Sequence, residues 1–578
     1  MRRLRGPGRA LLALGSVALL ATVATGAAGA ARGDDQLQKI NHIVVIYEEN
    51  HSFDDLYGGW EGVNGRANAD LAHTQQVDQT ADRTPYSCLQ QNDVNLVGLG
   101  CDAFPNTWWT IDSLLPPSAT TCPTILGAFA SPFGVSNGSG LTGGCTRDLV
   151  HKFYQEQYQL DGGRQDRYAT GSDSAGMSMG VYDTQALPIY RYLHSDGHPR
   201  YAIADNFFQA SFGGSFLNHQ WLIAAATPTV PNAAQDGSSA DRHSVVDVNG
   251  MVQTKGAPNP AGLSQYPLYI SPSPATIRDR EWTVKCGSTT LPLACGDFAV
   301  NTSQPVYRPF GAFGAKLPPQ TNPTIGDRLN TADIDWAWYA GGWDNAAGIT
   351  TGPGWTNGPG PACSDPNVDP STKAYPYCAS NVFQYHHQPF NYFQAFDPAT
   401  PEGQANREAH LKDERDFIHS AQASGSGCRL KAVSFVKPFG LENEHPGYSS
   451  EAGSDTHLVS LLKMIEGSAC AKDTMVIVTY DEFGGQWDHV PPPGQGNTNG
   501  PHDEWGPGTR VPTLIVSPFL RGNFVVDHTQ YDTTSILATI EGRYGLDPMK
   551  KTEPRSRDAL VNSLSNVFAA KQYEAAGP

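Results

Sequence analysis

Four short apolar runs rich in β-branched residues stand out along the chain. They cover residues 42–47, 431–436, 474–480 and 513–517. Apolar runs of about four to eight residues without polar alternation are typical of strands that are buried on both faces of a sheet. We therefore expect these four segments to lie in the core of the molecule.

Helical periodicity appears between and after these runs. In residues 451–468, leucine and isoleucine recur on one face and Gly467 lies near the end, as expected for a helix that packs on a core. Strands that alternate with helices predict an α/β fold with a mostly parallel central sheet covered by helices on both sides. The helices that we expect are 402–422, 451–468 and 532–545.

Carboxylate and amide side chains follow two of the predicted strands. Glu49 and Asn50 come shortly after the first run, and Asp481 and Glu482 come directly after the third. In open α/β sheets ligands bind at the carboxyl ends of the strands, and hard oxygen donors suit a divalent cation. A turn or helix-cap role would explain one such pair, but two pairs in the same position favour a metal site. We predict one divalent metal ion and leave Ca²⁺, Mg²⁺, Mn²⁺ and Zn²⁺ open.

Ser178 is the candidate nucleophile. It lies in residues 176–180, which match the G-x-S-x-G motif of serine hydrolases. That motif requires a hydrophobic strand directly before it, whereas residues 166–174 are polar, so the serine-esterase interpretation is disfavoured. A hydroxyl at a helix start beside a divalent cation can instead attack phosphorus, because coordination lowers its pKa and the helix N-terminus holds the phosphate.

Histidines in loops rich in Gly and Pro are candidates for binding a phosphoryl group and for protonating a leaving alkoxide. Any one of them alone would more often be structural. His489, close to the second acidic pair, is a further candidate, whereas His219 fits a structural role equally well. The four candidates are His151, His386, His387 and His445.

The first 30 residues are typical of a cleavable export signal. Four arginines precede an apolar stretch over about residues 10–24, and small residues follow up to Ala30. The apolar stretch is too short and Ala-rich for a permanent membrane span. We expect a secreted or periplasmic protein, exported by the Sec or twin-arginine route. Residues 31–578 then form one catalytic domain with loop-rich insertions around 61–146 and 226–330.

Charge and cysteine content narrow the function and the compartment. The net charge is −18, and loss of the four arginines in residues 1–30 makes it −22, which argues against nucleic-acid binding. Ten cysteines in an exported chain indicate disulfide bonds. The sequence leaves their connectivity open. Neighbouring cysteines that make plausible pairs are Cys286 and Cys295, Cys363 and Cys378, and Cys428 and Cys470.

Several short motifs are distributed over nearly the whole mature chain, from about residue 40 to 545. They are 48–54, 178–180, 204–208, 213–215, 385–387, 445–446, 479–485 and 487–489. Each motif alone is unspecific, but the set resembles the bacterial phospholipase C / acid phosphatase phosphoesterase family.

The resemblance implies an alkaline-phosphatase-like α/β fold, one bound metal ion and a covalent phosphoenzyme on Ser or Thr. Position by position, Ser178 looks like the nucleophile of the family. The histidines look like residues that bind phosphate or transfer protons, namely His151, His386, His387 and His445. The residues that look like metal ligands are Glu49, Asn50, Asp481 and Glu482.

Members of this family differ in the substrate that they cleave. The segments around His386 and His445 and the serine at 178 look closer to the acid phosphatase branch, which implies a phosphomonoester substrate. The alternative is a phospholipase C that cleaves phosphatidylcholine-like phosphodiesters, with a choline pocket that could use Trp336, Trp338 and Tyr339. A metal-loaded binding protein without turnover is the alternative of a different class. The sequence leaves the oligomeric state open.

Overall fold

The computed structural model describes most of the chain. The described residues are 33–78, 82–89, 104–116, 146, 148–172, 175–231, 298–311, 316–356, 383–448, 450–551, 553 and 556–574. The predicted export signal (1–30) lies outside this part, as do large portions of the two predicted insertions. One continuous apolar core runs through the described residues.

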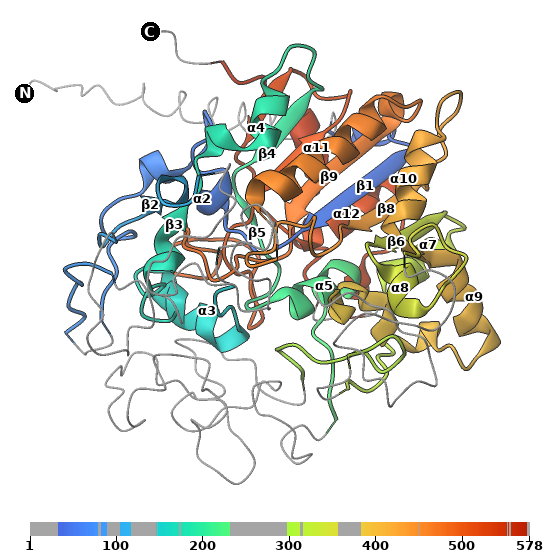
Figure 1. Cartoon of the computed structure of the whole chain (residues 1–578), viewed down its shortest axis with the longest axis horizontal. Helices are drawn as coiled ribbons and strands as arrows, with labels where there is room; N and C mark the ends of the chain where they lie inside the picture. Colours follow the sequence, from blue (N-terminus) through green and yellow to red (C-terminus); the bar gives the residue numbers. More distant parts are fainter. Residues whose placement is uncertain are drawn as a thin grey trace, which may run out of the picture.

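A central sheet lies between the main helices of the structure (Figure 1). Within the described residues it has eight strands, in the spatial order β11 (Phe524–Asp527), β4 (Tyr201–Ala204), β10 (Thr513–Val516), β9 (Thr474–Tyr480), β1 (His42–Glu48), β8 (Val433–Lys437), β6 (Trp336–Ala340) and β7 (Leu411–Asp413).

The sheet is mixed. Strand β10 runs antiparallel to both of its neighbours, whereas β9, β1, β8, β6 and β7 form a continuous parallel set. The predicted α/β class is confirmed, and the predicted parallel arrangement holds on this side of β10. All four predicted strands are present within one or two residues of their expected bounds, as β1, β8, β9 and β10.

Helices cover both faces of the sheet. On one face, α11 (Glu451–Glu466) packs against α4 (Pro188–Leu193) and α10 (Glu414–Gln422); on the other, α5 (Ser215–Ala224) packs against α12 (Thr534–Tyr544) and α7 (Ile325–Thr331). In Figure 1, α11 lies in front of the strands and α12 behind them. Strand β1 reaches both layers. The Tyr47 hydroxyl donates to the Asn218 carbonyl of α5, and Glu48 interacts electrostatically with Asp455 in α11.

Smaller elements complete the described structure. They are α2 (Phe53–Leu56), α3 (Phe153–Leu160), α8 (Trp343–Ala347) and α9 (Pro401–His410), and the strand pairs β12 (Tyr531–Asp532) with β5 (Phe207–Phe208) and β2 (Trp109–Thr110) with β3 (Gly180–Val181).

The predicted single helix over 402–422 is wrong. The segment forms α9, then the short strand β7, then α10. Strand β7 pairs with β6, and Asp413 caps α10 by accepting the Arg415 N–H while Asp416 reaches back to the Asp413 backbone. Pairing at the sheet edge together with this capping box therefore overrides the helical propensity of the segment.

A choline pocket built on Trp336, Trp338 and Tyr339 is also wrong. These residues form β6, and their exposed fractions are 0%, 0% and 3%. The Trp338 ring stacks on Phe435 with centroids 5.5 Å apart. The aromatic cluster is part of the core.

Two further expectations concern covalent links and the membrane. Cys428 and Cys470 form a disulfide, which confirms that predicted pair. Cys88 is also disulfide-bonded. The other two predicted pairs lie outside the described residues. In the described part of the chain, every helix is too short or too polar to cross a bilayer.

His457 joins α11 to α10 and makes stability depend on pH. Its Nε2 lies 2.7 Å from Glu414 Oε1. Burial opposes charge on the imidazole, but the hydrogen bond and charge of Glu414 outweigh burial and raise the pKa of His457 to about 9. Because this value exceeds the unfolded pKa of ~6.5, the pair stabilises the fold fully below that pH. The stabilisation is lost as the pH rises toward 9.

We expect His457→Gln to remove a pH-dependent stability of up to about 3 kcal/mol. Urea unfolding of the wild type and the variant, at about pH 6 and about pH 9.5, measures this difference. His502→Gln, at an exposed histidine, is the matched control. A destabilisation by His457→Gln that is equal at both pH values would contradict the prediction.

Candidate active site

The ends of β1 and β9 bring the four predicted metal ligands together. The two strands are parallel neighbours whose last residues are paired, so the chain segments that follow leave the sheet side by side. The backbone N–H of Asn50 donates to Asp481 Oδ1 at 3.2 Å. Glu49 and Glu482 lie beside these two residues, and all four are fully buried.

Gly484 allows the two segments to touch. Its φ is +62°, and a Cβ at this position would lie 2.2 Å from the carbonyl oxygen of Asn50. Asn50 itself has a φ of +57°, a left-handed conformation that Asn adopts more readily than most residues. The turn after β9 can therefore close directly over the end of β1.

The hydroxyl that reaches these ligands belongs to Ser215. Its Oγ lies 3.2 Å from Glu49 Oε2, 3.3 Å from Asn50 Oδ1 and 3.4 Å from Glu482 Oε1. Ser215 is the first residue of α5, after the N-cap Gly214, so its hydroxyl also lies at the positive end of the helix dipole. Sequence reasoning assigned no role to Ser215, although two glycines before a serine at the start of an apolar helix were an available signal.

The buried acids fit a divalent cation. Burial and the charge of Glu49 raise the pKa of Asp481 well above its usual value, and burial and the charge of Asp481 do the same for Glu482. Asp481 Oδ2 accepts no hydrogen bond from the described residues. Buried carboxylates with free oxygens are costly unless a cation pairs with them. Glu49, Asn50, Asp481 and Glu482 would hold such an ion, and their oxygen donors suit a hard metal.

Two basic side chains lie against Glu49. Lys437, the last residue of β8, contacts Glu49 Oε1 and donates to the carbonyls of Tyr47 and Glu48 at 2.8 and 3.1 Å. His387, in the 3₁₀ helix η10 (Tyr385–His387), places Nε2 at 3.0 Å from the same Oε1. Burial opposes ionisation of Glu49, but His387 and Lys437 outweigh burial and hold its pKa well below the usual value. Glu49 is therefore anionic.

His445 orients the side chain of Asn50. Its Nδ1 lies 2.8 Å from the Pro446 carbonyl, and its Nε2 lies 3.2 Å from Asn50 Nδ2. Burial lowers the pKa of His445 to about 3, so the ring is neutral near pH 7. We assign the proton to Nδ1, which donates to Pro446, and Nε2 then accepts from the amide of Asn50. This arrangement turns Asn50 Oδ1 toward Ser215.

Two further histidines extend the group. His219 Nδ1 lies 2.8 Å from the Ser215 carbonyl and 3.6 Å from Asp481 Oδ2, and its ring stacks on His387 with centroids 4.9 Å apart. The His386 ring lies 4.6 Å from that of His387. Burial lowers the pKa of both His219 and His386 well below the usual value. His219, for which a structural role was equally expected, thus lies within the site.

His151 faces the group from a less buried side. Its Nε2 lies 3.4 Å from Glu482 Oε1, and its side chain is 19% exposed. An opening with an empty volume of about 190 Å³, which includes open solvent, adjoins the site and is lined in part by His387 and Lys437. The two side chains that contact Glu49 therefore also line this opening.

Gln209 connects the loop before Ser215 to the turn after β9. Its Oε1 accepts from the Phe483 N–H at 2.9 Å, and its Nε2 donates to the Gly213 carbonyl at 3.1 Å and to Glu156 Oε2 at 2.9 Å. Glu156 Oε2 also accepts from the Gly213 N–H at 2.5 Å. The position of Ser215 is thus tied to the two acids that precede Phe483.

Ser178 lies in a different element, the 3₁₀ helix η4 (Ala175–Met179). Its carbonyl accepts from the Trp487 N–H at 2.8 Å. Strand β3 follows this serine, whereas a nucleophile elbow has its strand before the serine. Because the hydroxyl of Ser215 contacts three of the predicted metal ligands, we take Ser215 in place of Ser178 as our candidate nucleophile.

Asp488 and His489 belong to a separate ion-pair network. Asp488 Oδ1 accepts from Arg510 Nε at 2.9 Å, and His489 Nδ1 lies 2.5 Å from Asp54 Oδ2. All four residues are buried. The network links α2 to the segment after β9.

The sequence model of the phosphoesterase family matches residues 40–547. That range contains both acidic pairs, Ser215 and all the histidines described above. The chain belongs to the phosphoesterase family. It is a hydrolase that acts on phosphoric ester bonds, and a binding protein without turnover is therefore not supported.

Two curated relatives from Mycobacterium tuberculosis cover most of this phosphoesterase. "Phospholipase C A" is 24% identical over 93% of this chain and 79% of its own length, and "Phospholipase C B" is 23% identical over 93% and 80%. A solved structure of a protein in the alkaline phosphatase superfamily from Vibrio parahaemolyticus matches 41% of this chain and 50% of its own, at 12% identity and a TM-score of 0.20. That structural match is too weak to support an argument.

Asp481→Asn should remove one equivalent of bound divalent metal per chain, because it deletes a buried anionic ligand. Dialysis of chelator-treated protein against Zn²⁺ or Mn²⁺, followed by elemental analysis, counts the ions. Asp196→Asn, at an exposed acid, is the control and should match the wild type. Unchanged metal content in folded Asp481→Asn would show that these acids do not form a metal site.

Proposed function

We propose that this phosphoesterase is an exported, metal-dependent hydrolase of the acid phosphatase type that acts through a phosphoserine on Ser215. The observation that carries the proposal is the Ser215 hydroxyl, which lies 3.2 to 3.4 Å from oxygens of Glu49, Asn50 and Glu482. A divalent cation held there would neutralise phosphoryl charge and lower the pKa of a hydroxyl.

Ser215 Oγ attacks the phosphorus, a new P–O bond forms, and the bond from phosphorus to the ester oxygen breaks. The hydroxyl proton can pass to a carboxylate oxygen, since Glu49 Oε2 and Glu482 Oε1 both lie within 3.4 Å of Oγ. The first backbone N–H groups of α5 face the phosphoryl oxygens, as helix N-termini do in many phosphate sites. Water then cleaves the phosphoserine and restores the hydroxyl.

His151 is our candidate for the group that protonates the leaving alkoxide. It contacts Glu482 and is more exposed than His219 and His387, which also approach these acids, so a departing alcohol can reach it. His387 and Lys437 line the adjoining cavity and complement the negative phosphoryl group. His445 acts through Asn50, and His386 supports the ring of His387.

A small phosphomonoester is the substrate class that we propose. A monoester carries up to two negative charges, which suits a site beside the Lys437 ammonium. A phospholipase C that cleaves phosphatidylcholine-like diesters is the second candidate, and the names of the mycobacterial relatives favour it. We further propose one catalytic domain over residues 31–578, preceded by an export signal.

Ser215→Ala should lower kcat at least about 10³-fold, because it removes the attacking atom. Ser178→Ala is the matched control and should keep kcat within a few-fold of the wild type. Steady-state assays with p-nitrophenyl phosphate, together with trapping of the labelled phosphoenzyme at low pH, test both variants. Loss of turnover in Ser178→Ala with normal turnover in Ser215→Ala would reverse the assignment.

The kcat/KM for p-nitrophenyl phosphate should exceed that for p-nitrophenyl phosphorylcholine, because the Lys437 ammonium repels a quaternary ammonium and attracts a second phosphate charge. Parallel assays with purified enzyme and one saturating metal give the ratio. A preference for the choline diester would favour the phospholipase C candidate over the acid phosphatase type.

A further inference from the structure

A second group of buried acids surrounds His51, at the N-terminal end of α11. His51 follows β1 by three residues, Glu444 lies in the loop after β8, and Glu451 is the first residue of α11. One ligand atom from each of these three side chains lies within 4.8 Å of the other two. None of the three belongs to the Ser215 site.

Two carboxylate oxygens in this group are buried without a hydrogen-bond donor in the described part of the chain. They are Oε2 of Glu451 and Oε1 of Glu444, in residues that are 6% and 1% exposed. His51 Nε2 lies 2.8 Å from Glu451 Oε1 and 3.1 Å from the Glu444 carbonyl. One ring nitrogen can supply at most one proton for these oxygens, so the group has room for a further positive charge.

The surroundings of His51 match those of a metal-binding histidine. Its other ring nitrogen, Nδ1, contacts Asp55 Oδ2 in α2. A carboxylate on one imidazole nitrogen fixes the tautomer and directs the lone pair of the other nitrogen toward a metal. Here that second nitrogen points toward Glu451 and Glu444. The Tyr480 hydroxyl donates to Glu444 Oε2 at 2.5 Å and holds that carboxylate in place.

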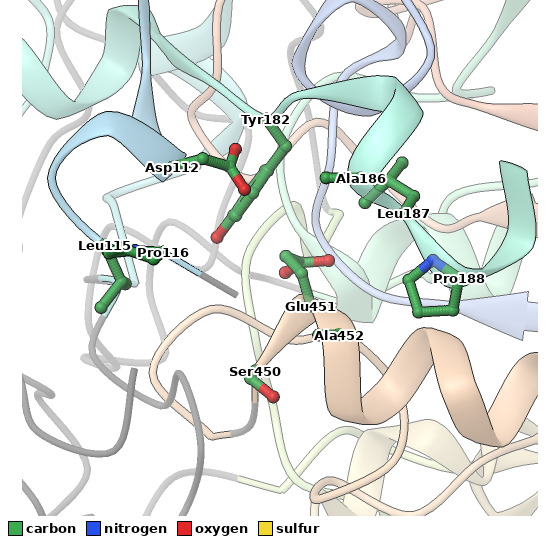
Figure 2. A pocket seen from close by; sticks show the side chains of 10 residues that line it. All are labelled: Asp112, Leu115, Pro116, Tyr182, Ala186, Leu187, Pro188, Ser450, Glu451 and Ala452. Atoms are coloured by element: carbon green, nitrogen blue, oxygen red, sulfur yellow. The ribbon is translucent and has the colours of Figure 1, made fainter. Parts of the chain in front are cut away.

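A cavity leads to this group. It has an empty volume of about 390 Å³, which includes open solvent, and Ser450 and Glu451 form part of its wall. Figure 2 shows the Glu451 carboxylate facing the cavity, with Tyr182 and Asp112 across from it. The acidic wall attracts cations, and an ion can enter from this side and keep a water ligand there.

We propose that His51, Glu444 and Glu451 bind a second divalent cation of the Zn²⁺ or Mn²⁺ class, distinct from the ion of the Ser215 site. One imidazole nitrogen with two carboxylates suits these metals better than Ca²⁺ or Mg²⁺, which prefer all-oxygen ligands. The ion links the ends of β1 and β8 to the start of α11. Its role is to fix the rim that carries Asn50 and His445.

Zinc stoichiometry in the full chain tests this proposal. The protein is stripped with a chelator, dialysed against Zn²⁺ and analysed by elemental analysis. The wild type should hold two equivalents, Glu451→Gln one, Asp481→Asn one and the double variant none. Asp112→Asn, on the wall of the same cavity but outside the ligand set, is the control and should hold two. Because Glu451→Gln loses this ion, zinc should raise the thermal unfolding midpoint of the variant by less than it raises that of the wild type.

Two results would overturn the proposal. The first is a single equivalent in the wild type that Asp481→Asn removes, since an imidazolium ion between Asp55 and Glu451 would then neutralise the group without metal. The second is two equivalents in folded Glu451→Gln. If that variant does not fold, zinc-edge anomalous scattering from wild-type crystals decides, and absence of a peak within bonding distance of His51 Nε2 rejects the site. The activity tests of Ser215 are independent of these outcomes.

Discussion

The structure depends on carboxylates that are buried at the carboxyl ends of β1 and β9. Taking charged groups out of water is costly unless opposite charge surrounds them. Lys437 and His387 balance Glu49, but burial and mutual repulsion leave Asp481 and Glu482 without such balance. A cation held there would resolve this imbalance. A lysine at the end of β8, a helix that begins at the site and histidines in the adjoining loops surround the same acids.

Much of the fold could be predicted because buried strands have a recognisable, continuously apolar composition. The runs that became β1, β8, β9 and β10 are continuous and apolar, and the acids after β1 and β9 had to meet once these strands were parallel neighbours in register. The long apolar stripe of α11 was equally clear. Strands of three or four residues, such as β7 and β4, carry too few positions for a period to show, and pairing with longer neighbours determines them.

The nucleophile could not be found from pattern alone. Ser178 and Ser215 both follow glycine-containing segments, and the helix α5 that begins at Ser215 is buried on every side, so it shows no amphipathic stripe. What distinguishes Ser215 is a set of contacts from distant parts of the chain, including the Gln209 bridge between Gly213 and Phe483. Lys437 was missed for a related reason, because a lysine at the end of an apolar run usually marks the return to solvent, whereas here it is buried against Glu49.

Alternation along β1 explains how one short segment serves two groups of acids. Successive side chains of a strand point to opposite faces, so Tyr47 reaches α5 while Glu48 faces α11. Just beyond the strand, Glu49 and Asn50 meet Ser215, and His51 meets Glu451. The loop after β8 repeats this division, since His445 bonds to Asn50 and the adjacent Glu444 lies beside His51. The two groups therefore share the segments after β1 and β8, and residues this close can couple in their effects on stability.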